Sequence, residues 1–326
     1  MNKKLKIIVT GGSGFIGSNL MSFLISREIE CLNIDFKPPK IKSHDNYWRN
    51  IDIRDYTKLE NEINRFNPTH IMHLAAATGM DVADISFFNA NTDGVRNIIE
   101  ASKKSTSVEK VLFTSSLLVC ENGYIPLDND DYCPPNLYGK SKMIGEQIVK
   151  ENDQASFDWT IVRPTSVWGP WCEGGYTAFF QTIKKGYYMH PGSEEIIKPI
   201  TFVGNTVFMM YKILLSDKSN RDTFYLCDYP EASTRKWAST IQESLGSARI
   251  RTVPIILLKV VALFFDLLKL LGYREPPISS FRLKNMLTGG NYPINNTQDV
   301  CKNLPNSLNE SVDLTIDWLT DQDLLR

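Results

Sequence analysis

A glycine-rich turn between an apolar run and a helical pattern constrains this chain more than any other feature. Residues 6–10, Lys-Ile-Ile-Val-Thr, have the composition of a buried strand. The turn that follows carries Gly11, Gly14 and Gly17, spaced as G-x-x-G-x-x-G, and the apolar positions of residues 15–27 then recur at helical spacing. Glycines in such a turn permit a tight bend, close approach of a pyrophosphate and close helix packing, and the helix N-terminus attracts phosphate. The strand–glycine–helix order therefore predicts dinucleotide binding.

The composition argues against several other functions. The chain has 326 residues, enough for about two domains, and its 36 Lys and Arg residues nearly balance 37 Asp and Glu residues. This balance gives no electrostatic support for nucleic-acid binding. Six scattered cysteines include no C-x-x-C pair, so neither a metal site nor a disulfide framework is expected. Such use of cysteine fits a reducing compartment, and we expect the protein to be cytoplasmic.

Strand and helix patterns alternate through the first half of the chain. Further strands are expected at residues 30–34, 51–55, 69–74, 108–114 and 159–162, and helices at residues 56–66, 84–104 and 137–152. This alternation predicts an α/β fold with a Rossmann-type doubly wound parallel sheet. Residues 1–165 would form this domain, and a helix and a strand within residues 202–230 would return to it.

The second half of the chain breaks this alternation, which predicts a smaller, mostly helical C-terminal substrate domain formed by residues 166–201 and 231–326. Residues 169–199 are expected to form substrate-contacting loops. An apolar segment at residues 255–271 carries Lys259, Asp266 and Lys269 on one helical face, and these charges argue against a membrane span. We expect a helix packed on the second domain, with a helix lying on a membrane surface as the alternative.

Asp35, at the end of the second predicted strand, is the first candidate for cofactor recognition. It lies about 20 residues after the glycines, where a carboxylate accepts hydrogen bonds from the adenosine ribose. A carboxylate would repel a 2′-phosphate, so NAD is favoured over NADP, although the nearby Lys37 weakens this preference. Asp52 is a candidate for the adenine amino group. His73, in the fourth strand, is expected to be a packed residue and not a catalyst.

Tyr138 and Lys142 form the chemically richest motif. They are four residues apart at the start of a predicted helix and therefore share one face. An ammonium near a phenol favours the phenolate and lowers the pKa of the phenol, which suits general acid/base catalysis near neutral pH. Ser116, at the end of the fifth predicted strand, would complete the proton-handling set.

Taken together, these motifs resemble the extended short-chain dehydrogenase/reductases, in particular the NAD-dependent epimerase/dehydratase group that acts on nucleotide sugars. The resemblance rests on the glycine turn, His73-Leu74-Ala75-Ala76, Ser115-Ser116, Tyr138-Gly139-Lys140-Ser141-Lys142, Arg163-Pro164-Thr165, Gly169-Pro170 and Phe202-Val203. It implies that Tyr138 is the acid/base, that Lys142 lowers its pKa and holds the nicotinamide ribose, and that Ser116 binds the reacting hydroxyl.

The resemblance and the pattern together define two sets of predicted binding residues. The cofactor set is Gly11, Gly14, Phe15, Ile16, Gly17, Asp35, Asp52, Ile53, Leu74, Ala75, Ala76, Asn91, Tyr138, Lys142 and Pro164. The substrate set is Thr165, Ser166, Lys198 and Arg282. Lys198, and less strongly Arg282, would bind the diphosphate of the sugar, and Ser166 stands where relatives often have Asn.

Departures from the family pattern sort the reaction type. The family resemblance implies a different residue after the hydroxyl residue in each class: an Asp-Glu pair in 4,6-dehydratases, a Cys in C3/C5-epimerising reductases and a Glu in decarboxylases. In this chain, Leu117 and Leu118 follow Ser116, so none of these three patterns is present. Hydride transfer at C4 of the hexose remains, as a 4-epimerase or as a 4-ketoreductase or 4-dehydrogenase with net redox. Cys120 stands where the family commonly has Tyr, and Asn205 where it often has Asp.

Two further expectations concern partners. A sterol-like alcohol dehydrogenase at a membrane surface is the rival function, because the apolar residues 255–271 and the region of residues 254–277 resemble such enzymes. The family resemblance also implies a homodimer, formed by the helices near residues 84–104 and 137–152.

Overall fold

A seven-stranded parallel sheet dominates the computed structural model, which describes residues 4–79, 82–270, 279–290 and 292–325. The strand order is β10-β6-β5-β4-β1-β2-β3, and every neighbouring pair is parallel. The strands are β1 (Lys6–Thr10), β2 (Glu30–Asp35), β3 (Trp48–Asn50), β4 (His70–His73), β5 (Lys110–Thr114), β6 (Asp158–Pro164) and β10 (Asp222–Leu226). The predicted doubly wound sheet is confirmed, and the predicted returning strand at residues 223–227 is β10, paired with β6.

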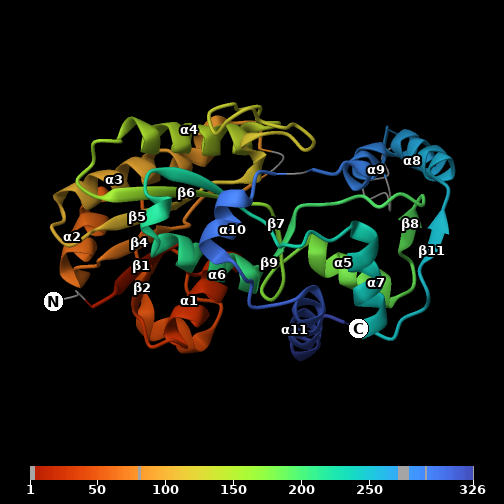
Figure 1. Cartoon of the computed structure of the whole chain (residues 1–326), viewed down its shortest axis with the longest axis horizontal. Helices are drawn as coiled ribbons and strands as arrows, with labels where there is room; N and C mark the ends of the chain where they lie inside the picture. Colours follow the sequence, from red (N-terminus) through yellow and green to blue (C-terminus); the bar gives the residue numbers. More distant parts are fainter. Residues whose placement is uncertain (1–3, 80–81, 271–278, 291, 326) are drawn as a thin grey trace.

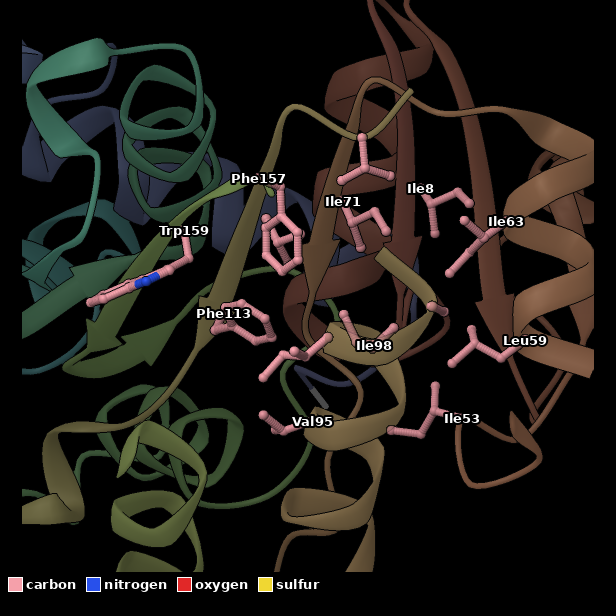
Figure 2. Close-up of a cluster of buried hydrophobic side chains, with 14 of the residues drawn as sticks. Ile8, Ile53, Leu59, Ile63, Ile71, Val95, Ile98, Phe113, Phe157 and Trp159 are labelled. Atoms are coloured by element: carbon pink, nitrogen blue, oxygen red, sulfur yellow. The ribbon is translucent and has the colours of Figure 1, made fainter. Parts of the chain in front are cut away.

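Helices cover both faces of this sheet (Figure 1). One apolar core joins the strands to α2 (Tyr56–Phe66), α3 (Asp93–Lys104) and α4 (Leu137–Glu151), and a second core joins them to α1 (Phe15–Ile25) and α6 (Val203–Leu214). Successive residues of β1 alternate between the cores, since Ile8 belongs to the first and Ile7 to the second. Figure 2 shows the first core, where Ile8 and Ile71 of the sheet lie near Ile63 of α2.

Polar side chains fix where several helices begin. The Asp55 carboxylate accepts a hydrogen bond from the Lys58 N–H at the start of α2, and Asn136 does the same for Gly139 at the start of α4. Ser307 and Glu310 form a reciprocal capping box at the start of α11 (Leu308–Asp321). These caps explain why the predicted starts of α2 and α4 agree closely with the structure.

Two predicted elements of the first domain are wrong in detail. At residues 51–55 we expect a short strand running into a turn: the strand is β3, which ends earlier, at Asn50, and the turn is present, because the Asp52 carboxylate accepts the Arg54 N–H. The single helix expected over residues 84–104 is divided into a 3₁₀ helix, η2 (Ile85–Asn91), and α3. Phe88 has non-helical angles (φ −95°, ψ 18°), and the Asn91 side chain bonds to a neighbouring loop.

The remaining elements form the part of the molecule away from the sheet (Figure 1). Residues 169–199 are not only loops, since they contain α5 (Gly175–Lys184) and β8 (Met189–Pro191). The other elements there are β7 (Ser166–Trp168), β9 (Ile200–Phe202), α7 (Thr234–Ser244), β11 (Arg251–Val253), α8 (Ile255–Leu270) and α9 (Ser280–Leu287). Parallel pairs join β7 to β9 and β8 to β11. In contrast, α10 (Asn295–Cys301) lies against the sheet (Figure 1), where Cys301 packs into the core between the sheet and α6.

Candidate active site

The predicted cofactor residues gather at the carboxyl edge of the sheet. The strand order reverses at β1, which lies between β2 and β4, and such switch points are where doubly wound sheets bind ligands. The glycine turn follows β1, Asp35 ends β2, and Leu74, Ala75 and Ala76 follow β4. The Leu74 N–H donates to the Thr10 carbonyl oxygen at 3.0 Å, which holds this loop beside the turn.

The three glycines of the turn are needed for different reasons. Gly11 has φ +75°, and a Cβ there would come within 2.6 Å of the Ala75 nitrogen. A Cβ at Gly17 would lie 2.1 Å from the Gly11 carbonyl oxygen, so this glycine lets α1 pack close to β1. A Cβ at Gly14 would approach only that same oxygen, at 3.3 Å. The space in front of the α1 N-terminus, at Phe15 and Ile16, is therefore a cradle that fits a dinucleotide pyrophosphate.

Asp35 is held in place at the edge of this cradle. Its carboxylate accepts the Ser13 N–H at 3.1 Å and the Lys37 N–H at 2.9 Å. Burial raises the pKa of Asp35, while the two N–H donors act to lower it. Each carboxylate oxygen retains a lone pair for a ligand hydroxyl. The residue thus fits the predicted contact with a ribose diol.

Tyr138 and Ser116 meet where α4 begins. Ser116 precedes the 3₁₀ helix η3 (Leu117–Val119), and its hydroxyl accepts the Leu118 N–H at 3.1 Å. The same hydroxyl lies close enough to the Tyr138 phenol to act against the rise in the pKa of that phenol. A Cβ at Gly139 would lie 2.1 Å from the Leu118 carbonyl oxygen, so glycine allows α4 to approach η3 this closely. On the other side, the ring of Phe88 in η2 lies 6.0 Å from the Tyr138 ring. The phenol is thereby positioned by backbone approach and aromatic packing.

Lys142 lies one helical turn behind Tyr138 and is buried. Its ammonium donates to the Thr114 carbonyl oxygen at 2.9 Å. Burial lowers the pKa of Lys142 from 10.5 to about 8, and Glu146 acts in the opposite direction. Without a bound ligand, the expected lowering of the pKa of Tyr138 is wrong. Burial raises this pKa, and Ser116 acts against the rise.

A buried ion pair fixes α4 against β6. Arg163 and Glu146 are both almost fully buried, with Nη2 and Oε2 2.7 Å apart. Arg163 also donates to the Tyr225 hydroxyl at 2.8 Å and to the Asn129 carbonyl oxygen at 2.7 Å. The sequence analysis did not identify Glu146 as part of the site. Its position four residues after Lys142, on the same face of the helix, could have indicated it. This network holds the helix that carries Tyr138 and Lys142.

Three of the predicted cofactor residues contact other residues of the protein through the side chains that we expected to contact the cofactor. Asp52 pairs with Arg54 at 2.6 Å, and Ile53 packs in the first core. The buried Asn91 accepts the Ala77 N–H at 2.7 Å and donates to the Ser141 hydroxyl at 2.9 Å. Asn91 therefore joins the loop after β4 to α4. His73 is buried and hydrogen-bonds with Thr10 at 2.7 Å, so its assignment as a packed residue is confirmed.

The predicted substrate residues follow β6. Thr165 is buried, and its hydroxyl bonds to Thr201 at 2.6 Å and to the Leu226 carbonyl oxygen at 2.8 Å. Ser166 pairs with Ile200 of β9, which brings Lys198, two residues earlier, to the same edge. Burial lowers the pKa of Lys198. The side chain of Arg282 lies outside the described residues.

The chain was compared with known proteins once this geometry was established. The model of the NAD dependent epimerase/dehydratase family matches residues 7–232, which include the glycine turn, Ser116, Tyr138 and Lys142. This chain belongs to that family. The assignment confirms the predicted relationship to extended short-chain dehydrogenase/reductases, and with it an NAD-dependent enzyme.

Relatives of this family member act on several kinds of substrate. N-acetyl-alpha-D-glucosaminyl-diphospho-ditrans,octacis-undecaprenol 4-epimerase of Escherichia coli O157:H7 is 26% identical over 324 residues, covering 96% of this chain and 94% of the relative. Sterol-4-alpha-carboxylate 3-dehydrogenase, decarboxylating, of Saccharomyces cerevisiae is 25% identical and covers 98% and 99%. The crystal structure of UDP-glucose 4-epimerase with UDP-glucose from Thermotoga maritima has a TM-score of 0.74 at 19% identity, covering 98% and 99%. The last likeness confirms the fold.

Asn205, one of the departures from the family pattern, has a structural explanation. Its amide nitrogen donates to the Asp228 carboxylate at 3.0 Å and to the Asn306 carbonyl oxygen at 3.0 Å. Burial raises the pKa of Asp228 from 3.8 to about 7, while the Phe202 N–H and Asn205 oppose this. A carboxylate at position 205 would face Asp228 without a donor, so an amide suits this environment. We find no comparable explanation for Cys120.

Proposed function

We propose that this family member is a 4-epimerase that acts on a hexose linked to a diphosphate, with NAD as its resident cofactor. The observation that carries the proposal is the position of Ser116 beside the Tyr138 phenol at the carboxyl edge of the sheet, next to the glycine cradle. This arrangement suits removal and return of a hydroxyl proton next to a bound nicotinamide nucleotide.

The cofactor would be held by groups that the fold already positions. The N–H groups at the start of α1 face the open side of Gly14 and would bind the pyrophosphate. The Asp35 carboxylate would accept hydrogen bonds from the adenosine ribose and disfavour a 2′-phosphate, which supports NAD over NADP. When bound, NAD supplies a reversible hydride acceptor.

Tyr138 and Ser116 would handle the proton at the sugar. The Tyr138 Oη would take the proton of the C4 hydroxyl and later return it, and the Ser116 Oγ would hold that hydroxyl in line with the phenol. Because burial raises the pKa of Tyr138, its phenolate needs a nearby positive charge, and Lys142 lies one turn away. Lys142 would also donate to the nicotinamide ribose.

The residues after Ser116 favour simple hydride transfer over elimination. Leu117 is buried and packs against Tyr225, Cys227 and Tyr292, so this position supplies neither an acid nor a base. A 4,6-dehydratase needs such a pair. With NAD retained and Tyr138 as the one acid/base, epimerisation is better supported than elimination.

The sugar could be linked through its diphosphate to either of two groups, a nucleoside or a lipid. A nucleotide sugar is the first, and Lys198 would contact its diphosphate from the loop before β9. A lipid diphosphate is the second, and the full-length relative from Escherichia coli, which acts on an undecaprenol-linked sugar, supports it. A sterol offers no diphosphate to Lys198, which makes the sterol-like alternative the weaker one.

Product analysis by NMR tests this function. The purified protein would be incubated with NAD and, separately, with UDP-, GDP- and dTDP-hexoses, a polyprenyl-diphosphate-linked hexosamine and a sterol 4-carboxylate. We expect a C4 epimer from one diphosphate-linked sugar without net change in nicotinamide absorbance. Net reduction of NAD with any of these substrates would contradict the epimerase proposal and indicate a dehydrogenase.

We further propose that the protein is a cytoplasmic homodimer. The neighbouring helices α3 and α4 cover one face of the sheet and would pack against the same pair of a second copy. Light scattering at micromolar concentration should give twice the mass of one chain. A species of single-chain mass would contradict this assembly.

A further inference from the structure

The helix α8 presents large apolar side chains to solvent. Six of them recur at helical spacing along one side and are each more than half exposed, from 53% to 78%. We call this set the α8 apolar face: Ile256, Leu257, Val260, Leu263, Phe264 and Leu267. Contiguous apolar surface of this kind marks a binding site more often than chance exposure.

The opposite side of α8 already has its packing partners. Leu258 and Ala262 are buried against Leu283 of α9, with Val253 and Leu287 beside them. Figure 1 shows α8 and α9 together at the end of the molecule farthest from the sheet. The predicted packing of this helix on the second domain is therefore present, but it buries only one side. The α8 apolar face has no partner among the described residues.

Exposed basic side chains lie at the edge of this face and at the start of α8. Lys259 of α8 flanks the face and is exposed. Arg251 of β11, just before α8, is exposed as well. The acid in α8, Asp266, accepts the Ser280 N–H at 3.1 Å and caps the start of α9. Apolar residues flanked by lysines and arginines are complementary to an anionic lipid surface.

We propose that the α8 apolar face docks on an anionic lipid bilayer, with the helix lying in the plane of the interface. Its side chains would enter the boundary between headgroups and acyl chains, and Lys259 would contact lipid phosphates. At 16 residues, α8 is about 24 Å long, shorter than a bilayer core of about 30 Å. No helix within the described ranges is long and apolar enough to cross a membrane.

A second copy of the chain fits this face less well than a lipid surface does. A two-fold contact would bury this face and the flanking Lys259 against the same face of a second copy, because such interfaces pair a patch with itself. The acid of α8, Asp266, accepts the Ser280 N–H on the α9 side, so it supplies no counter-charge at the apolar face. Lipid phosphates would neutralise Lys259.

The docking face is connected to the predicted substrate side of the site. The chain that leaves α9 runs beside the loop before β9, where the Gly290 N–H donates to the Ile197 carbonyl oxygen at 3.4 Å. Lys198 follows Ile197 directly. This inference goes beyond the proposed function, since lipid binding requires no turnover.

Vesicle flotation of the full chain tests the inference. We expect the wild-type protein to float with vesicles of phosphatidylcholine mixed with phosphatidylglycerol, and more weakly with phosphatidylcholine alone. The double variant L263Q/F264Q should bind at least about tenfold more weakly to both. Lys259→Glu should weaken binding about fivefold, and only with the anionic vesicles. Leu314→Gln, which changes an exposed leucine on α11, is the matched control and should float like the wild type.

Three results would overturn the inference. The first is a wild-type protein that does not float with either vesicle. The second is an equal loss of binding in Leu314→Gln and in L263Q/F264Q. The third is a dimer, seen by light scattering without vesicles, that L263Q/F264Q converts to a monomer, because a second copy would then occupy the face. NAD binding measured on each variant shows that a loss of flotation is not a loss of fold.

Discussion

The Ser116 hydroxyl lies beside the Tyr138 phenol, where α4 approaches η3 at Gly139. A methyl group at position 139 would lie 2.1 Å from the Leu118 carbonyl oxygen, so the helix must shift to admit it. Displacements of about 1 Å at a catalytic group can cost 10²-fold in rate. The backbone of η3 is thus as much a determinant of the site as its side chains.

Gly139→Ala should lower kcat by about 10- to 100-fold with a smaller effect on KM, because it moves the phenol away from Ser116. Gly175→Ala is a matched control, since a Cβ at Gly175 meets nothing within 4 Å. Steady-state kinetics on both variants provide the measurement. Equal activity of the two variants would show that the approach of α4 to η3 does not position Tyr138.

Lys142→Met should make stability less dependent on pH between 8 and 10.5. In the wild type, burial lowers the pKa of Lys142 from 10.5 to about 8, so the unfolded chain binds more protons in this window. The wild type therefore gains stability as pH rises through it, by at most about 1.4 kcal/mol per pH unit from this group. Methionine lacks this contribution. Urea titrations at several pH values test this, and a constant difference between the two proteins would contradict it.

Asp35→Ser should weaken NAD binding by at least about tenfold and reduce the discrimination against NADP. The carboxylate lies beside the glycine cradle, where it is positioned by the Ser13 and Lys37 N–H groups. Its loss removes charge-assisted hydrogen bonds to the ribose, each worth about 1.5–3 kcal/mol, and the repulsion of a 2′-phosphate. Isothermal titration with both nucleotides gives the ratio. An unchanged preference for NAD would place recognition of the ribose elsewhere.

Asn205→Asp should destabilise the fold by about 1–3 kcal/mol at pH values above 7. The new carboxylate would face Asp228, whose pKa burial raises to about 7. As pH falls below that value, the pair can share a proton and the loss should shrink, because the folded variant then binds more protons than its unfolded chain. Thermal unfolding across pH measures the difference from the wild type. A difference independent of pH would refute the account of Asn205.

The parallel sheet could be predicted from the sequence because each strand and turn is indicated by residues within its own short segment. The glycine turn after residues 6–10 and the paired motifs at Ser116 and Tyr138 each specify their own short segment, and the parallel sheet brings their ends to one edge. The division of residues 84–104 escaped prediction because it depends on a distant contact. Asn91 bonds to Ala77 and Ser141, and no helical pattern contains that information.

Electrostatics was the part least accessible from sequence. Spacing placed Lys142 near Tyr138, but the sign of the pKa change depends on burial, which only the packed structure shows. The same limit applies to Asn205, whose partner Asp228 follows β10 and is held at the start of α6 by the Phe202 N–H. The exposed side of α8 is a third example, because an apolar segment alone does not reveal which side remains uncovered.

The fate of a deuterium atom placed at C4 of the sugar tests the central claim most directly. If Tyr138 removes the C4 hydroxyl proton while the hydrogen at C4 goes to NAD and returns, the epimer should retain its deuterium in ordinary water. Tyr138→Phe should form this product about 10²- to 10⁴-fold more slowly while still binding NAD. Loss of the deuterium to solvent, or full turnover by Tyr138→Phe, would contradict the account.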